Sequence, residues 1–135
     1  SATLARDLCG FIRTHKKTEQ VIVSSFHHSA LAEFRKSCPS VKTGASSDEA
    51  LRYVIASKLG LGGWFKPDAD HLQLPINSGR IDVITSRFIK KAHRDGFLVD
   101  AWTINEAASM RYLMSLGVDG IITDYPERLL SVLDE

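Results

Sequence analysis

Two adjacent histidines, His27 and His28, and the nearby Ser25 are residues whose types could do chemistry. Histidine transfers protons near neutral pH, and serine can act as a nucleophile when a base lies beside it. Ser25, however, lacks the Gly-x-Ser-x-Gly turn that exposes a nucleophilic serine. Adjacent histidines point apart, and no histidine lies four residues away to complete a metal site. We therefore expect a solvated pair of loop histidines.

Carboxylates form a second set of candidates. Asp68, Asp70 and His71 have the side-chain types of metal ligands. Asp124 ends the last apolar run, just before Pro126, and could serve as a ligand or a base. A carboxylate just before a helix usually interacts favourably with the helix dipole. A structural role is therefore favoured for Asp124.

These residues lie on a chain that repeats one unit, a short apolar strand followed by a loop and an amphipathic helix. Strand starts recur at intervals of roughly 20 to 30 residues, which predicts βαβ units and a parallel sheet. A complete (β/α)₈ barrel needs eight strands and about 250 residues. The five expected strands are Val21–Phe26, which should be buried, then Lys42–Ala45, His71–Pro75, Phe97–Thr103 and Gly120–Thr123.

The helices between these strands should each bury one apolar face. For the first helix the expected face is Leu4, Leu8, Phe11 and Ile12, and for the third it is Leu51, Val54, Ile55 and Leu59. Helix starts are expected at Ser29, at a capping box of Ser46-Ser47-Asp48-Glu49, at Ser86 and at Asn105. Helix ends are expected near Pro39, Gly60, Gly96 and Gly117.

The composition limits the function classes. Seventeen basic and sixteen acidic residues leave a net charge of +1, which argues against a general binder of nucleic acid or membrane surfaces. Cys9 and Cys38 are too few for a disulfide framework. Two reduced thiols are expected, which favours a cytoplasmic protein. No apolar run reaches the length of a membrane span, and no signal-peptide pattern occurs. The chain starts at Ser1 without a methionine, as a cleavage boundary would leave it.

Two segments near the C-terminus resemble the closing part of the glycerophosphodiester phosphodiesterase family. Trp102, Thr103 and Asn105 form a Trp-Thr-x-Asn strand end, and Gly117–Asp124 reads Gly-x-Asp-Gly-Ile-Ile-Thr-Asp. Upstream, Val21–Phe26 (VIVSSF) is similar to the Ser-Phe strand of that family. The resemblance runs from Val21 to the C-terminus with the pieces in the right order and spacing.

The resemblance implies a (β/α)₈ TIM barrel that hydrolyses glycerophosphodiesters to glycerol 3-phosphate and an alcohol with a divalent metal, calcium or magnesium. The family's catalytic motifs are His-Arg-Gly, Glu-x-Asp with His-Asp, and Glu-x-Lys, on the first three strands. No such motif lies on a strand-like run here, since the only His-Arg pair, His93-Arg94, precedes Asp95 late in an expected helix. Residues 1–135 are therefore expected to form strands four to eight of a partial barrel. The resemblance places no catalytic residue or metal ligand in this chain and gives Asp68, Asp70 and His71 no metal role.

The resemblance also suggests which residues would contact substrate. The carboxyl ends of the strands form the active-site face of a barrel, and Phe26, Gln73 and Trp102 should lie there. The two aromatic rings would form an apolar wall for the glycerol end, and Gln73 would offer a hydrogen bond. Asn105 is expected at the same face, with helix capping favoured over ligand contact.

The sequence thus predicts the C-terminal portion of a metal-dependent phosphodiesterase of lipid and glycerol metabolism. Its partner in the full-length parent would be a small glycerophosphodiester, with no nucleic acid and no membrane span. The chain alone is expected to be inactive. The alternative is a non-catalytic half-barrel that acts as a self-assembly or interaction module. It would associate through the open sheet edges at Val21–Ser25 and Gly120–Thr123.

Overall fold

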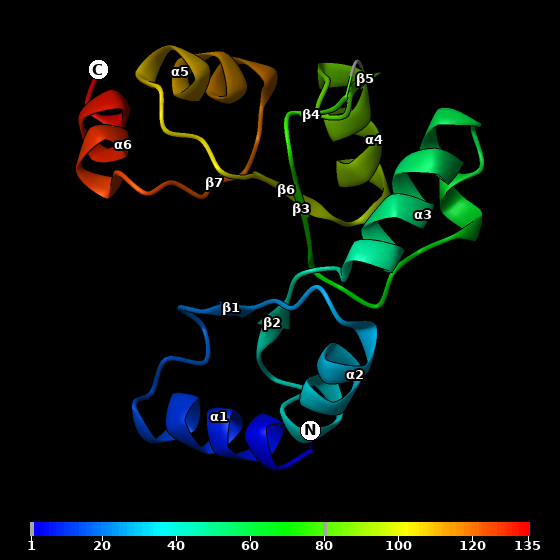
Figure 1. The fold of residues 1–135 in the computed structure, drawn as a ribbon, viewed down its shortest axis with the longest axis vertical. Helices are drawn as coiled ribbons and strands as arrows, with labels where there is room; N and C mark the ends of the chain where they lie inside the picture. Colours follow the sequence, from blue (N-terminus) through cyan, green and yellow to red (C-terminus); the bar gives the residue numbers. More distant parts are fainter. Residues whose placement is uncertain (1, 80) are drawn as a thin grey trace. The chain divides into compact units, whose positions relative to one another are not determined.

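The computed structural model describes residues 2–79 and 81–135 (Figure 1). The chain forms two compact units, one that ends at His71 and one that runs from Leu72 to Glu135. Helices and short, mostly parallel strands alternate within the described residues, which confirms the predicted α/β class. None of the described helices is both long enough and apolar enough to cross a bilayer.

The first unit contains two parallel strands and three α-helices. Its sheet pairs Ile22 with Lys42 and Val23 with Thr43, and the next residue, Gly44, bridges in parallel to His71. β1 was expected to be buried, but it is shorter than expected and Ile22 is exposed. The elements are α1 (Ala2–Thr14), β1 (Ile22–Val23), α2 (His28–Ser37), β2 (Lys42–Thr43), α3 (Ser47–Lys58) and the 3₁₀ turn η1 (Gly62–Trp64).

A disulfide between Cys9 and Cys38 joins α1 to the residue after α2, with the two Cα atoms 5.6 Å apart. The expectation of two reduced thiols is therefore wrong, and its argument for a cytoplasmic protein no longer stands. The bond also decides which face of α1 is buried. Around it, one buried apolar cluster of this unit contains Ala5, Cys9, Ile12, Phe34, Cys38 and Val41.

The predicted apolar faces of α1 and α3 are largely wrong. Ile12 is buried as expected, but Leu4 and Phe11 are exposed, because the cross-linked stripe of Ala5 and Cys9 packs inward instead. On α3 the prediction correctly included Val54. The other buried residues of that helix are Ala50, Tyr53 and Ala56, whereas Leu51, Ile55 and Leu59 are exposed.

The second unit contains a three-stranded sheet in the order β3-β6-β7. β6 and β7 are parallel, with Asp100 opposite Gly120 and Ala101 opposite Ile121. The antiparallel pair β4 and β5 was not predicted. The elements are β3 (His71–Leu74), which begins at the boundary between the units, β4 (Asn77–Ser78), β5 (Ile81–Asp82), α4 (Ser86–Asp95), β6 (Leu98–Ala101), α5 (Ala107–Leu116), β7 (Gly120–Ile121) and α6 (Pro126–Leu133).

Alternation along the strands separates two faces of this sheet. Leu72 and Leu74 of β3 are buried, as are Val99 and Ala101 of β6. Successive strand residues point to opposite sides. The intervening residues Gln73 and Asp100 therefore lie on the other face. The helices bury Phe88, Ile89 and Ala92 from α4, Met110 and Leu113 from α5, and Val132 from α6.

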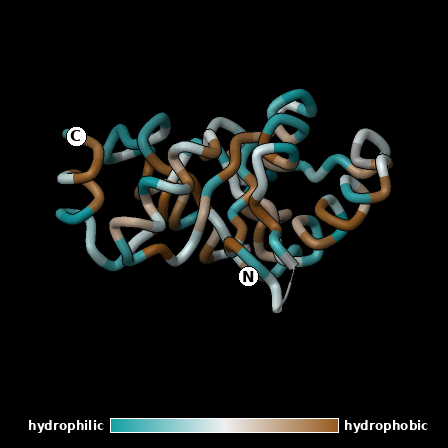
Figure 2. Tube along the Cα trace, turned by 90° about the horizontal axis from the view of Figure 1, so that it is seen from above, coloured by the Kyte–Doolittle hydropathy of each residue, from teal (hydrophilic) through white to brown (hydrophobic). Residues whose placement is uncertain are grey.

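The helix ends follow the sequence more closely than the helix starts. Gly96 and Gly117 both have φ of 93°, a left-handed conformation that glycine adopts without steric cost. The predicted capping box of Ser46 and Glu49 is present. The other predicted N-caps are wrong, since the cap positions are His27 for α2, Thr85 for α4 and Glu106 for α5 rather than Ser29, Ser86 and Asn105. Near the C-terminus, α6 shows brown and teal turns, as an amphipathic helix does (Figure 2).

Candidate functional site

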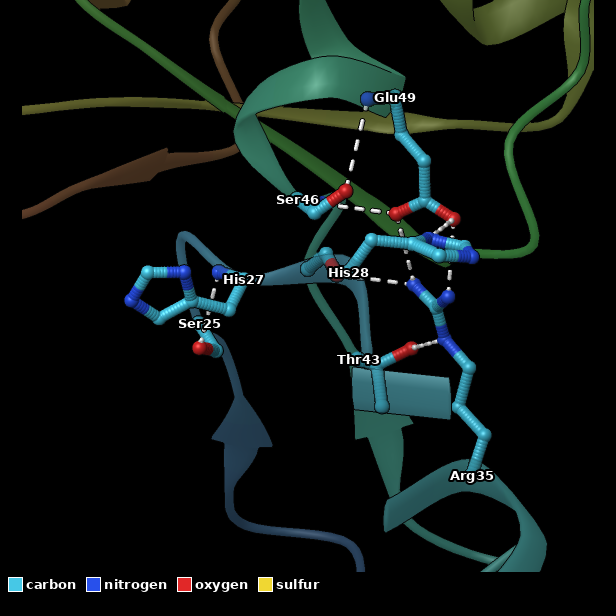
Figure 3. A network of polar contacts seen from close by, with 8 residues as sticks. Ser25, His27, His28, Arg35, Thr43, Ser46 and Glu49 are labelled. Atoms are coloured by element: carbon cyan, nitrogen blue, oxygen red, sulfur yellow. Dashed lines mark hydrogen bonds and ion pairs between the residues drawn. The ribbon is translucent and has the colours of Figure 1, made fainter. Parts of the chain in front are cut away.

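A polar network at the carboxyl ends of β1 and β2 is centred on Glu49, the third residue of α3 (Figure 3). Arg35 donates to both Glu49 carboxylate oxygens, at 2.9 and 3.2 Å. The same guanidinium donates to Thr43 Oγ1 at 3.0 Å and to the Gly44 carbonyl at 3.2 Å. The Ser46 backbone N–H donates to Glu49 at 2.8 Å. One ion pair thus ties together α2, β2 and α3.

The charge on Glu49 is stabilised by its partners. Burial alone would raise the pKa of this carboxyl group, but the hydrogen bond from Arg35 lowers it. The backbone of Ser46 and the positive charge of Arg35 lower it further, so the pKa of Glu49 lies below its usual value of 4.5. Glu49 is therefore an anion at neutral pH and does not act as a proton donor there.

The two histidine rings point in different directions, as the sequence predicts (Figure 3). The expectation of two loop residues is wrong for His28, which is the first residue of α2. The His28 Nδ1 lies 3.3 Å from Glu49 Oε1, and its side chain is 58% exposed. The ring of His27 points away from the network, while its backbone N–H donates to Ser25 Oγ at 3.1 Å. The contact between His28 and Glu49 was not predicted, because the two residues are distant in sequence.

Asp70 has a structural contact in place of a metal role. Its carboxylate accepts a hydrogen bond from the Thr43 backbone N–H at 2.8 Å, and its own N–H donates to the Thr43 carbonyl at 2.9 Å. Within residues 2–79 and 81–135, no group of three His, Cys, Asp or Glu side chains is placed to hold a metal ion. The described donor set therefore does not fit the divalent metal that the sequence resemblance implies, and no catalytic step is assigned to a metal on this chain.

In the second unit, residues of three adjacent strands lie around one buried carboxylate. Gln73 of β3 donates through Nε2 to the Asp100 carboxylate of β6 at 3.3 Å. Asp100 is only 4% exposed, and Gly120 of β7 lies opposite it in the register. A Cβ at position 120 would stand 2.5 Å from Asp100 Oδ1. The missing side chain of Gly120 therefore makes room for the buried carboxylate.

Trp102 follows directly after β6 and is half-buried. Its backbone N–H donates to the Leu74 carbonyl at 3.0 Å, which extends the pairing of β6 with β3 by one step. Because side chains two residues apart in extended backbone share a face, Trp102 lies on the same face as Asp100, closer to the carboxyl end.

Asn105 joins the ends of β6 and β7 and does not cap a helix. Its Nδ2 donates to Asp124 Oδ2 at 2.9 Å, and its Oδ1 accepts from the Asp124 backbone N–H at 3.0 Å and from Thr123 Oγ1 at 3.2 Å. Arg128 of α6 donates to the Asn105 backbone carbonyl. Asp124 thus has the structural role that the sequence favours, although its partner is Asn105.

The three predicted substrate residues fall in different units. Gln73 and Trp102 come from adjacent strands of the second unit. Phe26 belongs to the first unit, beyond the end of β1, where its side chain is 71% exposed. Asp100 was missed. The signal for it was an acidic residue inside the otherwise apolar run FLVDAWT.

Comparison with known proteins identifies the family of this chain. The model of the glycerophosphoryl diester phosphodiesterase family matches residues 3–128. The chain belongs to this family. A glycerophosphodiester phosphodiesterase of Bacillus altitudinis is 26% identical over 121 residues, which cover 87% of this chain and 44% of that protein.

Solved structures of family members share the fold. A structure from Silicibacter pomeroyi that is named for the same activity matches with a TM-score of 0.72 at 21% identity, covering 98% of this chain and 44% of the other. An Oleispira antarctica phosphodiesterase in complex with the product sn-glycerol-3-phosphate matches with a TM-score of 0.65 at 20% identity, covering 100% of this chain and 52% of the other. This chain therefore has the architecture of part of a TIM barrel and spans about half the length of these relatives.

Proposed function

We propose that this chain is the substrate-side wall of a metal-dependent glycerophosphodiester phosphodiesterase. The full-length enzyme would hydrolyse glycerophosphodiesters to glycerol 3-phosphate and an alcohol. Residues 1–135 would form strands four to eight. Strands outside this sequence would contribute the ligands of the metal, which would be calcium or magnesium, and the proton-transfer groups. Such a protein would act in lipid and glycerol metabolism.

The face shared by Gln73, Asp100 and Trp102 is the observation that carries this proposal. It combines a large, half-buried aromatic ring with a fixed polar pair near the carboxyl ends of parallel strands. TIM barrels bind their substrates at that end. An aromatic ring and a few placed polar groups suit a small polyol, because the ring contacts its carbon atoms and the polar groups bind its hydroxyls. The family membership supports glycerophosphodiesters as the substrate class.

The hydrolysis step itself is assigned to the strands outside this sequence. A phosphodiester needs its developing negative charge stabilised and a proton delivered to the leaving oxygen. In the complete enzyme, a divalent metal held by residues outside this sequence would meet the first need. On this chain, the pKa of Glu49 is held low and its carboxylate is bound to Arg35. The contribution of Glu49 is therefore to hold α2, β2 and α3 together rather than to transfer protons.

The test compares the isolated chain with the full-length polypeptide from the native gene. Both are purified, freed of metal with a chelator and assayed on glycerophosphocholine with added calcium or magnesium, while released glycerol 3-phosphate is measured. We expect metal-dependent turnover from the full-length protein and none above the metal-only background from the isolated chain. Turnover by the isolated chain that disappears in His28→Ala would contradict the proposed division. A full-length protein without activity on any glycerophosphodiester would overturn the proposed function.

The second candidate function is that of a half-barrel that self-assembles. The strand order is the observation that supports it. Among the described residues, β1 pairs only with β2, and β7 lies at the end of the order β3-β6-β7. Each of these strands has one side on which another strand could pair. A stop codon or an unrelated domain immediately upstream of Ser1 in the native gene would favour this candidate over the enzyme.

A further inference from the structure

We propose that Asp100 is a positioning residue, which fixes the side-chain amide of Gln73 so that its carbonyl oxygen accepts a hydrogen bond from a glycerol hydroxyl. This inference rests on the proposed function and deepens it, because it specifies which hydrogen-bonding group the site presents. It assigns a role to a buried carboxylate that the hydrolysis step does not use.

The geometry of the pair comes first. Asp100 Oδ2 accepts from Gln73 Nε2 at 3.3 Å across adjacent strands. The carboxylate is 4% exposed and lies over Gly120, where a side chain would displace it. A short, buried side chain confined in this way has little rotamer freedom. Asp100 is therefore a fixed acceptor, whereas Gln73 is longer and only half-buried.

The chemistry of the two groups then determines the orientation of the amide. The carboxylate oxygen of Asp100 is the acceptor of this hydrogen bond, and a glutamine amide has a donor NH₂ at one end and an acceptor oxygen at the other. The NH₂ end of Gln73 must therefore face Asp100. The carbonyl oxygen then points away from Asp100 and is the end that a bound molecule would meet. Without the carboxylate, the amide could rotate and offer either end.

The position of Trp102 connects this amide to substrate. Trp102 lies on the face of Asp100, closer to the carboxyl end of the strand, and its backbone is paired with Leu74, the residue after Gln73. A polyol in contact with the indole ring would have the Gln73 amide next to it. Since an acceptor is presented, a hydroxyl that donates should bind better than a group of similar size that cannot donate.

The experiment uses the full-length enzyme and three substrates, namely glycerophosphocholine and its two deoxyfluoro analogues, in which fluorine replaces one glycerol hydroxyl or the other. Fluorine is close to hydroxyl in size but cannot donate. The variant Asp100→Leu keeps the branched shape and removes the acceptor, while Asp100→Asn retains an acceptor oxygen. We expect the wild type to discriminate against one analogue by roughly 3- to 10-fold in kcat/KM, the range for one hydrogen bond.

In Asp100→Leu that discrimination should disappear, with KM for the natural substrate raised roughly 3- to 10-fold and kcat little changed, because only uniform binding is lost. Asp100→Asn should retain most of the discrimination. The matched control is Asp119→Asn, which changes a carboxylate that binds His93 and the Val99 backbone N–H at the amino end of the strands. It should lower thermal stability without changing the preference among substrates.

Two outcomes would overturn the inference while leaving the proposed function intact. The first is a wild-type enzyme that hydrolyses all three substrates equally well. The second is Asp100→Leu with full discrimination, as measured both by kinetics and by calorimetric binding of glycerol 3-phosphate and its fluoro analogues. If Asp100→Leu fails to fold, Gln73→Leu provides the same comparison, since it removes the amide and keeps Asp100. An enzyme inactive on all substrates would contradict the proposed function instead.

Discussion

Trp102 carries the largest apolar surface on the face that also holds Gln73 and Asp100, and it is only half-buried. In the full-length protein, we expect Trp102→Ala to weaken substrate binding far more than folding. Partial burial of the ring against a substrate stabilises binding by roughly 1–2 kcal/mol. A fully packed tryptophan would instead lose about 3–5 kcal/mol of stability on truncation.

Thermal melting and steady-state kinetics on the same variant separate these two roles of Trp102. An unchanged KM together with a melting temperature lowered by many degrees would show that this side chain is packing. Phe26→Ala is the companion variant, because Phe26 is more exposed than Trp102 and its loss should change stability little.

Glu49 makes the stability of the first unit depend on pH. Its pKa in the folded chain lies below the usual 4.5, so the folded state favours the anion more than the unfolded state does. The resulting stabilisation is complete above the unfolded pKa and is lost as pH falls through the lower, folded pKa. We expect Glu49→Gln to lower the free energy of unfolding at pH 7 by about 1–3 kcal/mol. The variant should also show a flatter stability curve below about pH 5.

Urea unfolding of the wild type and the variant between pH 3 and 7 measures this dependence. The matched control is Glu33→Gln, which removes a carboxylate from a more exposed pair with Lys36, 3.5 Å away, where little stability is at stake. Parallel pH curves for the wild type and Glu49→Gln would contradict the role given to the network of Arg35 and Glu49.

At the scale of elements, the disulfide determines how α1 packs. It closes a loop between residues that are 29 positions apart and anchors the buried stripe of Ala5, Cys9 and Ile12. Replacing both Cys9 and Cys38 by alanine should cost about 2–4 kcal/mol of stability, since the unfolded chain regains the freedom that the cross-link removes.

Melting with and without a thiol reductant tests this role of the disulfide. Reduction should lower the melting temperature of the wild type, whereas the double alanine variant should not respond to the reductant. A wild type whose melting is unaffected by complete reduction, verified by thiol titration, would show that the bond adds no stability.

The helices also show which parts of the fold the sequence could predict. Signals confined to a few residues predicted their structures correctly, such as the capping box at Ser46 and the helix ends at Gly96 and Gly117. The buried faces of α1 and α3 were not, because Leu4 and Leu51 continue an apolar pattern that does not reach the core. Which of two neighbouring stripes packs inward depends on partners elsewhere in the chain, such as Cys38 for α1.

The residues of the candidate site likewise fall into those that the sequence could predict and those that it could not. The placement of Gln73 on a strand and of Trp102 just after one followed from the strand pattern and the family motif. The role of Asp100 could not be predicted, because it depends on the contact with Gly120. The register that places the two residues opposite each other is set by the tertiary structure. His28 and Glu49 likewise meet only through the packing of α2 against α3.

At the scale of the whole molecule, we expect the isolated chain to self-associate through the edges of β1 and β7, each of which has one strand neighbour among the described residues. β1 has a single strand partner among the described residues and exposes Ile22. Sedimentation velocity over a hundredfold range of concentration should show dimers or larger species. Ile22→Lys should shift the chain toward monomer, because a charge on an edge strand opposes pairing.

The control for this prediction is Leu4→Lys, which places the same charge on an exposed apolar position of a helix instead of a strand edge. It should leave the association unchanged. A wild-type chain that stays monomeric at the highest concentration would count against the self-assembly alternative. Association that is weakened equally by both variants would indicate general hydrophobic contact rather than strand pairing.

The close approach of Asp100 to Gly120 has a consequence for how this sequence can evolve. The backbone at Gly120 does not have the positive φ that favours glycine, so space alone excludes a side chain there. Gly120→Ala should cost about 1–3 kcal/mol, but Asp100→Ala would leave only a Cβ 3.5 Å from the new carbon, an ordinary contact. The order of substitutions then matters: position 120 acquires a side chain at lower cost after position 100 has lost its carboxylate. Relatives with a side chain at 120 should lack an acidic residue at 100, and thermal melting of the two single variants and the double variant should show that Asp100→Ala rescues Gly120→Ala.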